Sequence, residues 1–258
     1  MPELPDVEVY RRTLARSCLH RTLARVEVSD ARMLHGTSAA ALGRALRGHE
    51  WTGTARRGKH LLVSLSGGGL LVLHFGMTGR LELDDRAEDD HTRVLFDFED
   101  GRRLGLVDQR RLGRVALADS EEQYAADQDL GPDALSLSAG DLADLARQGR
   151  GSLNGLLMDQ SRICGIGNVY SDEICFQARL DPTRAVASLD DADLRRLHRQ
   201  LGRVLRLAVE RGADPGQMPR TWLTPRRVDG ARCPRDRGTV RAYSSGGRRG
   251  FRCPDCQA

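Results

Sequence analysis

Lysine is nearly absent from this chain. Lysine and arginine together number 40, and Lys59 is the only lysine among them. Arginine stays protonated in proteins, whereas lysine transfers protons once its surroundings lower its pKa. The sequence therefore indicates that Lys59 is a candidate for proton-transfer chemistry. The alternative is a codon bias against lysine that left one lysine without a special role.

Long apolar segments are missing as well. No run approaches the roughly 18 apolar residues of a membrane-spanning helix, so we expect no membrane association. The first residues include the acids Glu3, Asp6 and Glu8 in place of a secretory signal, which predicts a cytoplasmic protein. An apolar content of 40% over 258 residues is enough for two modest domains or one large domain.

The charges are distributed unevenly around a net value of +4. Ten arginines stand against three aspartates from Arg220 to the end, whereas eight acids stand against one arginine between Asp119 and Arg147. A basic tail of this density is typical of proteins that bind polyanions. A solvated surface without a partner is the alternative.

The N-terminal residues favour covalent chemistry. Removal of Met1 would leave Pro2 with a secondary amine, and a free α-amino group with a pKa of about 7.7–8.0 is partly neutral near physiological pH. Such an amine attacks an electrophilic carbon and forms an iminium, and Glu3 beside it is placed to donate or accept a proton. The alternative is an ordinary terminus with a proline in the first turn of a helix.

Hydrophobic spacing divides the chain into a strand-rich first part and a helical second part. An amphipathic helix is predicted at 5–18 and a short helical insertion at 37–47. Hairpins about glycine turns are predicted at 61–74 and 94–107, so we expect a β-sandwich or flattened barrel with flanking helices. After an acidic connection at 119–133, helices are predicted at 139–148, 152–160, 170–178 and 192–211.

Three loops carry groups that suit a nucleic acid. Residues 74–79 place Met77 between glycines, and residues 108–113 contain paired arginines. An apolar wedge with an arginine is suited to entering a duplex, although a core position for Met77 is the alternative. At 164–170, two glycines and Asn168 precede a helix, an arrangement that offers backbone N–H groups to a phosphate or forms a plain interhelical turn.

The tail contains a cluster of possible metal ligands. Cys233 and Asp236 are followed, after sixteen residues, by Cys253 and Cys256. Paired C-x2-C motifs indicate a zinc ribbon, and a carboxylate also binds zinc, so we expect a structural Zn²⁺ in a Cys3Asp site. A three-cysteine or metal-free finger is the alternative. The other cysteines, Cys18, Cys164 and Cys175, are expected to be reduced core residues.

Seven short motifs follow one another along nearly the whole chain. They are Pro-Glu-Leu-Pro-Asp-Val-Glu at 2–8, Gly-Lys-His at 58–60, His-Phe-Gly-Met-Thr-Gly at 74–79, Asp-Gln-Arg-Arg-Leu-Gly at 108–113, Leu-Gly-Pro-Asp-Ala-Leu at 130–135, Gly-Ile-Gly-Asn-Val-Tyr-Ser-Asp-Glu at 165–173 and Cys-Pro-Asp-Cys-Gln at 253–257. In this order they resemble the formamidopyrimidine-DNA glycosylase/endonuclease VIII family of base-excision repair enzymes.

The resemblance implies a multidomain α+β fold. It consists of an N-terminal β-sandwich with flanking helices, a C-terminal helix–two-turn–helix domain and a zinc-ribbon-like finger. The expected boundaries are 1–118 for the catalytic sandwich, 119–132 for the acidic linker, 133–225 for the helix–two-turn–helix domain and 226–258 for the zinc finger. The resemblance further implies a monomer that works on damaged double-stranded DNA at the bacterial nucleoid.

The resemblance also implies a bifunctional DNA glycosylase and abasic-site lyase for oxidised or otherwise damaged bases. Pro2 would attack C1′ of a flipped-out nucleotide, Glu3 would protonate the opening sugar, and Lys59 would assist elimination and contact phosphate. Arg248 would bind phosphate and assist the second of the β- and δ-eliminations. The implied DNA contacts are Asn168 at a phosphate, His91, and Met77, Arg110 and Leu112 in the gap left by the flipped base.

Four features depart from the family pattern. Leu112 stands where phenylalanine is common, so a wedge remains but stacking is lost. Asn154 stands where lysine is usual, which removes one phosphate contact. Residues 211–218 do not resemble the glycine-rich loop that covers an oxidised guanine, and this weakens the assignment to 8-oxoguanine. Asp236 weakens the assignment of zinc.

Two other functions fit parts of the sequence. The altered reading and finger elements suit a lesion- or abasic-site-binding protein without base-excision activity, although the presence of Pro2, Glu3 and Lys59 argues against it. A zinc-ribbon protein that binds nucleic acid without preference for lesions is the third possibility.

Overall fold

The computed structural model describes residues 1–87 and 89–257, and they form two compact units. The first unit contains Met1–Pro2 and Asp6–Gln128, and the second contains Glu3–Pro5 and the chain from Asp129 onwards. The four domain boundaries expected from the sequence stay predictions. Among the described residues no helix is long and apolar enough to span a membrane.

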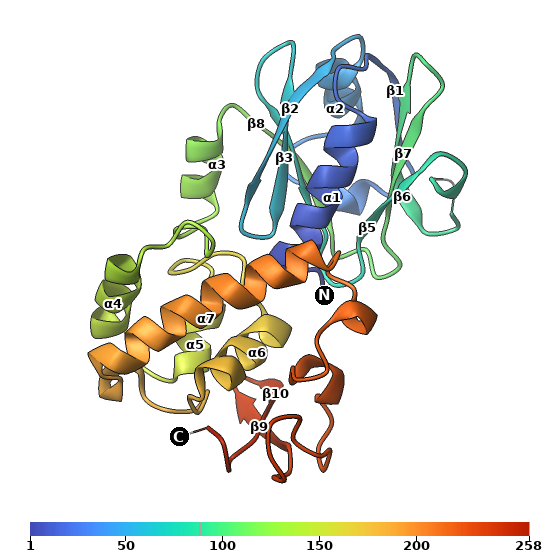
Figure 1. The fold of residues 1–258 in the computed structure, drawn as a ribbon. Coiled ribbons are helices and arrows are strands. Elements are labelled where there is room, and N and C mark those ends of the chain that lie inside the picture. The colour runs from blue at the N-terminus through green and yellow to red at the C-terminus, as the bar shows by residue number, and fades with distance from the viewer. Residues whose placement is uncertain (88, 258) are drawn as a thin grey trace. The chain divides into compact units, whose positions relative to one another are not determined.

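Two four-stranded antiparallel sheets build the first unit (Figure 1). One has the strand order β1-β6-β7-β5 and the other β2-β3-β4-β8. Both hairpins predicted from the sequence are confirmed, as β3–β4 and β6–β7. The strands are β1 Leu23–Val28, β2 Trp51–Arg57, β3 His60–Leu65, β4 Leu70–His74, β5 Arg80–Leu83, β6 Thr92–Phe98, β7 Arg103–Val107 and β8 Arg114–Ala118.

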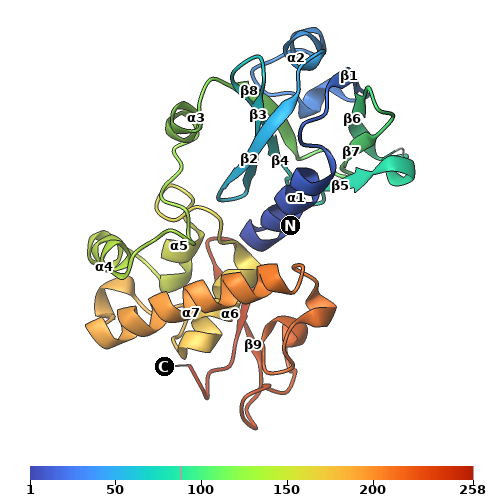
Figure 2. The same cartoon turned by 45° about the horizontal axis from the view of Figure 1, so that its top comes forward.

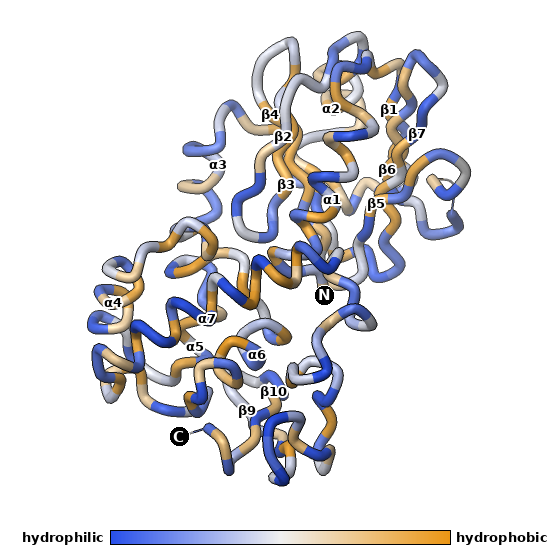
Figure 3. The backbone as a smooth tube through the Cα atoms, viewed as in Figure 1, coloured by the Kyte–Doolittle hydropathy of each residue, from blue (hydrophilic) through white to orange (hydrophobic). Residues whose placement is uncertain are grey.

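One apolar core lies between the two sheets. Alternate residues of β3 and β6, among them Leu61, Val63, Val94 and Phe96, belong to the same buried cluster, as the two-residue period of strands requires. Trp51 packs edge-on against Phe96, with 5.3 Å between the ring centroids. In Figure 3 these strands are mainly orange and the connecting loops mainly blue. The predicted β-sandwich is therefore confirmed.

Three helices accompany the sheets. α1 (Leu4–Ser17) begins in the second unit and continues into the first, and α2 (Ala39–Leu46) buries Leu42 and Leu46 in the sandwich core. α3 (Glu121–Asp127) lies in the acidic stretch that the sequence predicted only as a connection. Ser120 caps α3 by accepting from the Gln123 N–H, and Tyr124 is buried, so capping and packing form a helix despite the negative charge.

The second unit is helical and ends in a hairpin. Its longest helix, α7, has a buried stripe of Leu194, Leu197, Leu201 and Val204 at helical spacing, and α6 packs beside it (Figure 2). A small separate core joins Phe176 of α6 to Val240 and two cysteines of the tail. The elements are α4 Ala139–Gln148, α5 Leu153–Met158, α6 Asn168–Ala178, α7 Asp191–Glu210, β9 Arg241–Ser245 and β10 Arg248–Arg252.

Candidate functional site

The carboxylate of Glu3 is fixed at the start of α6. Its oxygens accept hydrogen bonds from the backbone N–H groups of Gly167 at 2.7 Å, Val169 at 2.8 Å and Tyr170 at 3.2 Å. Glu3 is 1% exposed. The first N–H groups of a helix have no partner within the helix and carry its positive dipole end, so they suit a carboxylate. The side chain next to Pro2 is thus held at one defined place.

This contact corrects one interpretation of the sequence. The sequence left two interpretations of residues 164–170 open, a phosphate site and a plain interhelical turn, whereas in the structure the N–H groups of Gly167, Val169 and Tyr170 in this segment donate to Glu3. The close approach requires a glycine at 167, because an added Cβ would lie 2.5 Å from the carboxyl carbon of Glu3. The backbone N–H of Leu4 also donates to the Gly165 carbonyl at 3.0 Å.

Lys59 lies in the two-residue turn between β2 and β3. Gly58 precedes it with a φ of +57°, the conformation that a tight hairpin turn requires and that glycine adopts without strain. The Lys59 side chain is only 8% exposed. The sole lysine is therefore a buried residue of the first unit, the unit that also contains Pro2.

Two stacked histidines follow Lys59 in the same sheet. His60 and His74 face each other across β3 and β4 with 4.8 Å between ring centroids, and His60 Nδ1 lies 2.9 Å from the Tyr124 hydroxyl. Burial lowers the pKa of His60 to about 3, with further lowering by His74 and Lys59. Burial and Lys59 lower the pKa of His74 to about 4. Both imidazoles are therefore neutral near pH 7.

The predicted wedge residues are exposed on two loops of the first unit. Met77 is 42% exposed and Leu112 is 45% exposed, an unusual state for large apolar side chains. Arg110 is exposed in the second of these loops. His91 lies before β6, where its Nδ1 is 3.2 Å from the Arg93 guanidinium. Met77 is thus not the core residue that the alternative interpretation required.

Asn168 and the hairpin of the finger lie together in the second unit. The side-chain amide of Asn168 donates to the carbonyl of Arg249 at 3.0 Å. Arg248 is exposed at the start of β10, directly after the Gly246-Gly247 turn, whose φ angles are positive. The expected phosphate ligands Asn168 and Arg248 therefore belong to neighbouring segments.

Asp172 is a buried anchor of the finger hairpin that the sequence analysis missed. It is fully buried and accepts from the Tyr243 hydroxyl at 2.6 Å, the Phe251 N–H at 2.8 Å and the Arg227 guanidinium at 2.8 Å. Burial raises its pKa against the opposing effect of Arg227. Asp172 fastens α6 to both strands of the hairpin. Its only signal in the sequence was its place in the 165–173 motif.

Asn154 is also buried, at 2% exposure. Its side-chain amide donates to the Ser171 hydroxyl at 2.8 Å. The residue therefore satisfies a polar contact inside the second unit and does not replace the surface phosphate contact of a lysine.

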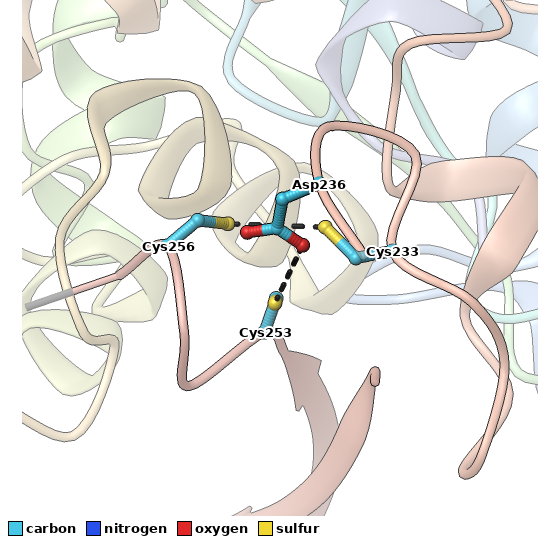
Figure 4. Close-up of side chains that lie close together, drawn as sticks. All are labelled: Cys233, Asp236, Cys253 and Cys256. Carbon is cyan, nitrogen blue, oxygen red and sulfur yellow. Dashed lines mark hydrogen bonds between the residues drawn. The ribbon is translucent and has the colours of Figure 1, made fainter. Parts of the chain in front are cut away.

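Cys233, Asp236, Cys253 and Cys256 point towards one another (Figure 4). One ligand atom from each lies within 4.8 Å of all the others. The Cys233 and Cys256 sulfurs are 3.9 Å apart, and the Cys253 sulfur is 3.8 Å from Asp236 Oδ1. Tetrahedral Zn²⁺ with Zn–S bonds of about 2.3 Å would separate two sulfurs by about 3.8 Å. The donors and their spacing therefore fit a zinc ion.

Family comparisons agree with this geometry. The model of the formamidopyrimidine-DNA glycosylase N-terminal domain matches residues 1–115, and that of the formamidopyrimidine-DNA glycosylase H2TH domain matches residues 130–219. This chain belongs to the formamidopyrimidine-DNA glycosylase family. Membership supports DNA glycosylase activity in base excision repair.

Individual members of the formamidopyrimidine-DNA glycosylase family match the chain from end to end. The enzyme of Moorella thermoacetica is 38% identical over 263 residues, covering 99% of this chain and 92% of that protein. The enzyme of Thermus thermophilus is 38% identical over 275 residues, and the match covers 100% of this chain and 98% of that protein. A solved complex between the Lactococcus lactis Fpg and DNA containing an abasic site matches the fold with a TM-score of 0.89 at 24% identity, covering 99% of both chains.

The site residues expected for a formamidopyrimidine-DNA glycosylase fall into separate groups. The second unit contains Glu3, Asn168, Arg248 and the four metal-ligand candidates, and the first contains Pro2, Lys59, Met77, His91, Arg110 and Leu112. Their roles stay predictions. Gly167 was quoted in the 165–173 motif, but its need to be a glycine became visible only beside Glu3.

Proposed function

We propose that this protein is a bifunctional DNA glycosylase and abasic-site lyase that uses Pro2 as its nucleophile. The observation that carries the proposal is the fixed position of Glu3, the neighbour of Pro2, on three backbone N–H groups. Positioning a proton-transferring group before the substrate arrives lowers the entropic barrier of the reaction. A protein that only binds DNA would not require a buried carboxylate held at one defined position next to its N-terminus.

The proposed reaction begins when the neutral secondary amine of Pro2, exposed by removal of Met1, attacks C1′ of the damaged nucleotide. The bond between C1′ and the base breaks, and the base keeps the bonding pair and takes a proton from solvent. The Glu3 carboxylate takes the proton that the Pro2 nitrogen loses and passes it to the ring oxygen as the C1′–O bond breaks, and the freed nitrogen lone pair forms an iminium with C1′. The positive iminium acidifies the C2′ proton for the next step.

Strand cleavage then follows by two eliminations. Loss of the C2′ proton expels the 3′ phosphate, and a second proton loss expels the 5′ phosphate. We assign Lys59 to the first elimination and to phosphate contact, and Arg248 to phosphate contact during the second. Lys59 is the only lysine of the sequence and is buried at 8% exposure, and both observations support this assignment.

Damaged double-stranded DNA is the proposed substrate. A base within a duplex is inaccessible, so the target nucleotide must leave the stack at an energetic cost. Met77, Arg110 and Leu112 would fill the resulting gap, and their exposure supports this assignment. His91, Asn168 and Arg248 would bind the backbone, where contacts fix register rather than sequence.

A structural Zn²⁺ is proposed for the finger. Cys233, Asp236, Cys253 and Cys256 would coordinate it, and the ion would stabilise the finger, whose own apolar core is small. Metal binding of this kind contributes directly to folding. Residues of the chain, and not the ion, carry every step of the reaction above.

Borohydride trapping tests the proposal. Protein without Met1 is incubated with duplexes that contain an abasic site, an oxidised purine or an oxidised pyrimidine, and borohydride reduces any iminium to a stable amine. We expect a covalent protein–DNA band that Pro2→Gly abolishes or sharply reduces. If the protein binds abasic DNA but gives neither a trapped band nor strand cleavage on any of these duplexes, the result would favour the lesion-binding alternative.

A further inference from the structure

The carboxylate of Asp108 joins the two loops that carry the wedge residues, here called the insertion loops (residues 75–79 and 108–113). Its Oδ1 accepts from the Thr78 hydroxyl at 2.5 Å and the Arg110 N–H at 3.2 Å. Its Oδ2 accepts from the Leu112 N–H at 2.8 Å and the Gly113 N–H at 2.7 Å. Asp108 is 0% exposed, so the carboxylate is an internal support and not a surface group.

The insertion loops also touch each other directly. A Cβ at Gly76 would lie 2.4 Å from the carbonyl carbon of Leu112, and Gly76 has a φ of +55°. The Thr78 hydroxyl oxygen accepts from the Arg110 N–H at 3.1 Å. Met77 thus follows a glycine whose backbone lies against the loop that carries Leu112.

Arg93 connects the same residue to His91. The Arg93 side chain is buried at 8% exposure, and its Nε donates to the Asp108 carbonyl at 2.9 Å. The Asp108 N–H in turn donates to the His91 carbonyl at 2.9 Å. Asp108 therefore contacts both insertion loops and, through its N–H and carbonyl, the segment that contains His91 and Arg93.

We propose that Asp108 is a positioning residue that presents Met77, Arg110 and Leu112 as one rigid wedge. This inference rests on the proposed function. A wedge offsets the cost of unstacking only if its side chains are already ordered, because ordering them on binding would consume part of the interaction energy. The Asp108 carboxylate, which accepts four hydrogen bonds, orders both insertion loops, and Asp108 is proposed to act without contacting DNA.

The Asp108→Asn variant is the direct test. The amide keeps a similar shape but replaces one oxygen by an NH2 group, so the hydrogen bond from at least one of the backbone N–H groups is lost. In single-turnover reactions we expect base excision from a duplex lesion to fall by about 10-fold to 100-fold, the range that follows from misplacing groups by up to about 1 Å. Cleavage at a preformed abasic site, where no base must be unstacked, should change by less than about threefold, because it bypasses the cost of flipping.

A double-mutant cycle separates positioning from general structural damage. If Asp108 acts through the wedge, Asp108→Asn in a Met77→Ala background should reduce excision much less than in the native background, because coupled residues are non-additive. Asp97→Asn is the matched control, since Asp97 pairs with Arg25 on the same unit away from the insertion loops. We expect that variant to excise the damaged base at the native rate.

The outcomes separate the two proposals. Equal losses in excision and abasic-site cleavage, or additive effects of Asp108→Asn and Met77→Ala, would overturn the positioning role and leave the proposed function intact. Absence of base release and of trapped complex with the native protein would overturn both. If Asp108→Asn does not fold, Thr78→Val removes the hydrogen bond to Oδ1 and the one that Thr78 accepts from the Arg110 N–H, and it must show the same selective loss.

Discussion

Replacement of Gly167 by alanine should disable base excision without unfolding the protein. The added Cβ would lie 2.5 Å from Cδ and 2.6 Å from Oε1 of Glu3, whereas ordinary contacts begin at 3.4 Å. The carboxyl group must therefore move by about 1 Å, and a displacement of this size typically costs about 100-fold in rate. The backbone itself tolerates alanine, because φ of Gly167 is −124°.

The same substitution has a predictable effect on stability. Displacing Glu3 weakens charge-assisted hydrogen bonds worth about 1.5–3 kcal/mol each, and alanine regains only about 0.4–1 kcal/mol through the unfolded state. We therefore expect the free energy of unfolding to fall by about 1–3 kcal/mol. For a chain of this size, a melting temperature lower by about 2–4 °C per kcal/mol should follow.

Single-turnover excision of a damaged base, followed by gel, measures the rate, and urea unfolding measures the stability. Gly43→Ala is the matched control, because Gly43 lies in α2 with nothing within 4 Å of its added Cβ. That variant should be more stable by about 0.5–1 kcal/mol, with a native rate. A native excision rate in Gly167→Ala would refute the claim that the reaction depends on the position of Glu3.

Two further predictions concern pH and metal. The pKa values of His60 and His74 are about 3 and 4 in the folded chain but about 6.5 in the unfolded chain. Below pH 6.5 the unfolded state therefore binds more protons than the folded state. The free energy of unfolding should fall by about 2 kcal/mol per histidine when the pH is lowered from above 6.5 to 5. His74→Phe should halve this dependence in urea titrations, and an unchanged dependence would contradict the assignment. Asp236→Cys should slow the loss of zinc to a chelator, and Asp236→Ala should accelerate it. The control Asp255→Ala, beside the cluster, should lose zinc at the native rate. Equal zinc content and equal release in all variants would rule out Asp236 as a ligand.

Features encoded by neighbouring residues were predictable from the sequence. The metal-ligand candidates stand in two short motifs, and the hairpins are marked by strands on either side of glycine turns. The exposure of Met77 and Leu112 also agrees with the loops in which the sequence places them. In each case the residues that decide the structure lie within a few positions of one another.

Long-range contacts could not be predicted in this way. Glu3 and the N–H of Gly167 are 164 positions apart, so the glycine turn alone suggested either a phosphate as its partner or a plain turn between helices. Thr78 and Asp108 are 30 positions apart, and the neighbouring arginines were the more obvious candidates in that loop. The acidic charge of α3 favoured a connection, but the Ser120 cap and the burial of Tyr124 outweigh it.

We propose that the nitrogen of Pro2 forms the covalent intermediate. The most direct test is to reduce the complex with abasic DNA, digest it with trypsin and locate the adduct by mass spectrometry, after the mass of the intact chain has confirmed loss of Met1. We expect the adduct on the peptide of residues 2–11. Protein that retains Met1 should form no adduct, because its Pro2 nitrogen is an amide. An adduct on Lys59, or a trapped complex with Met1 still in place, would contradict it.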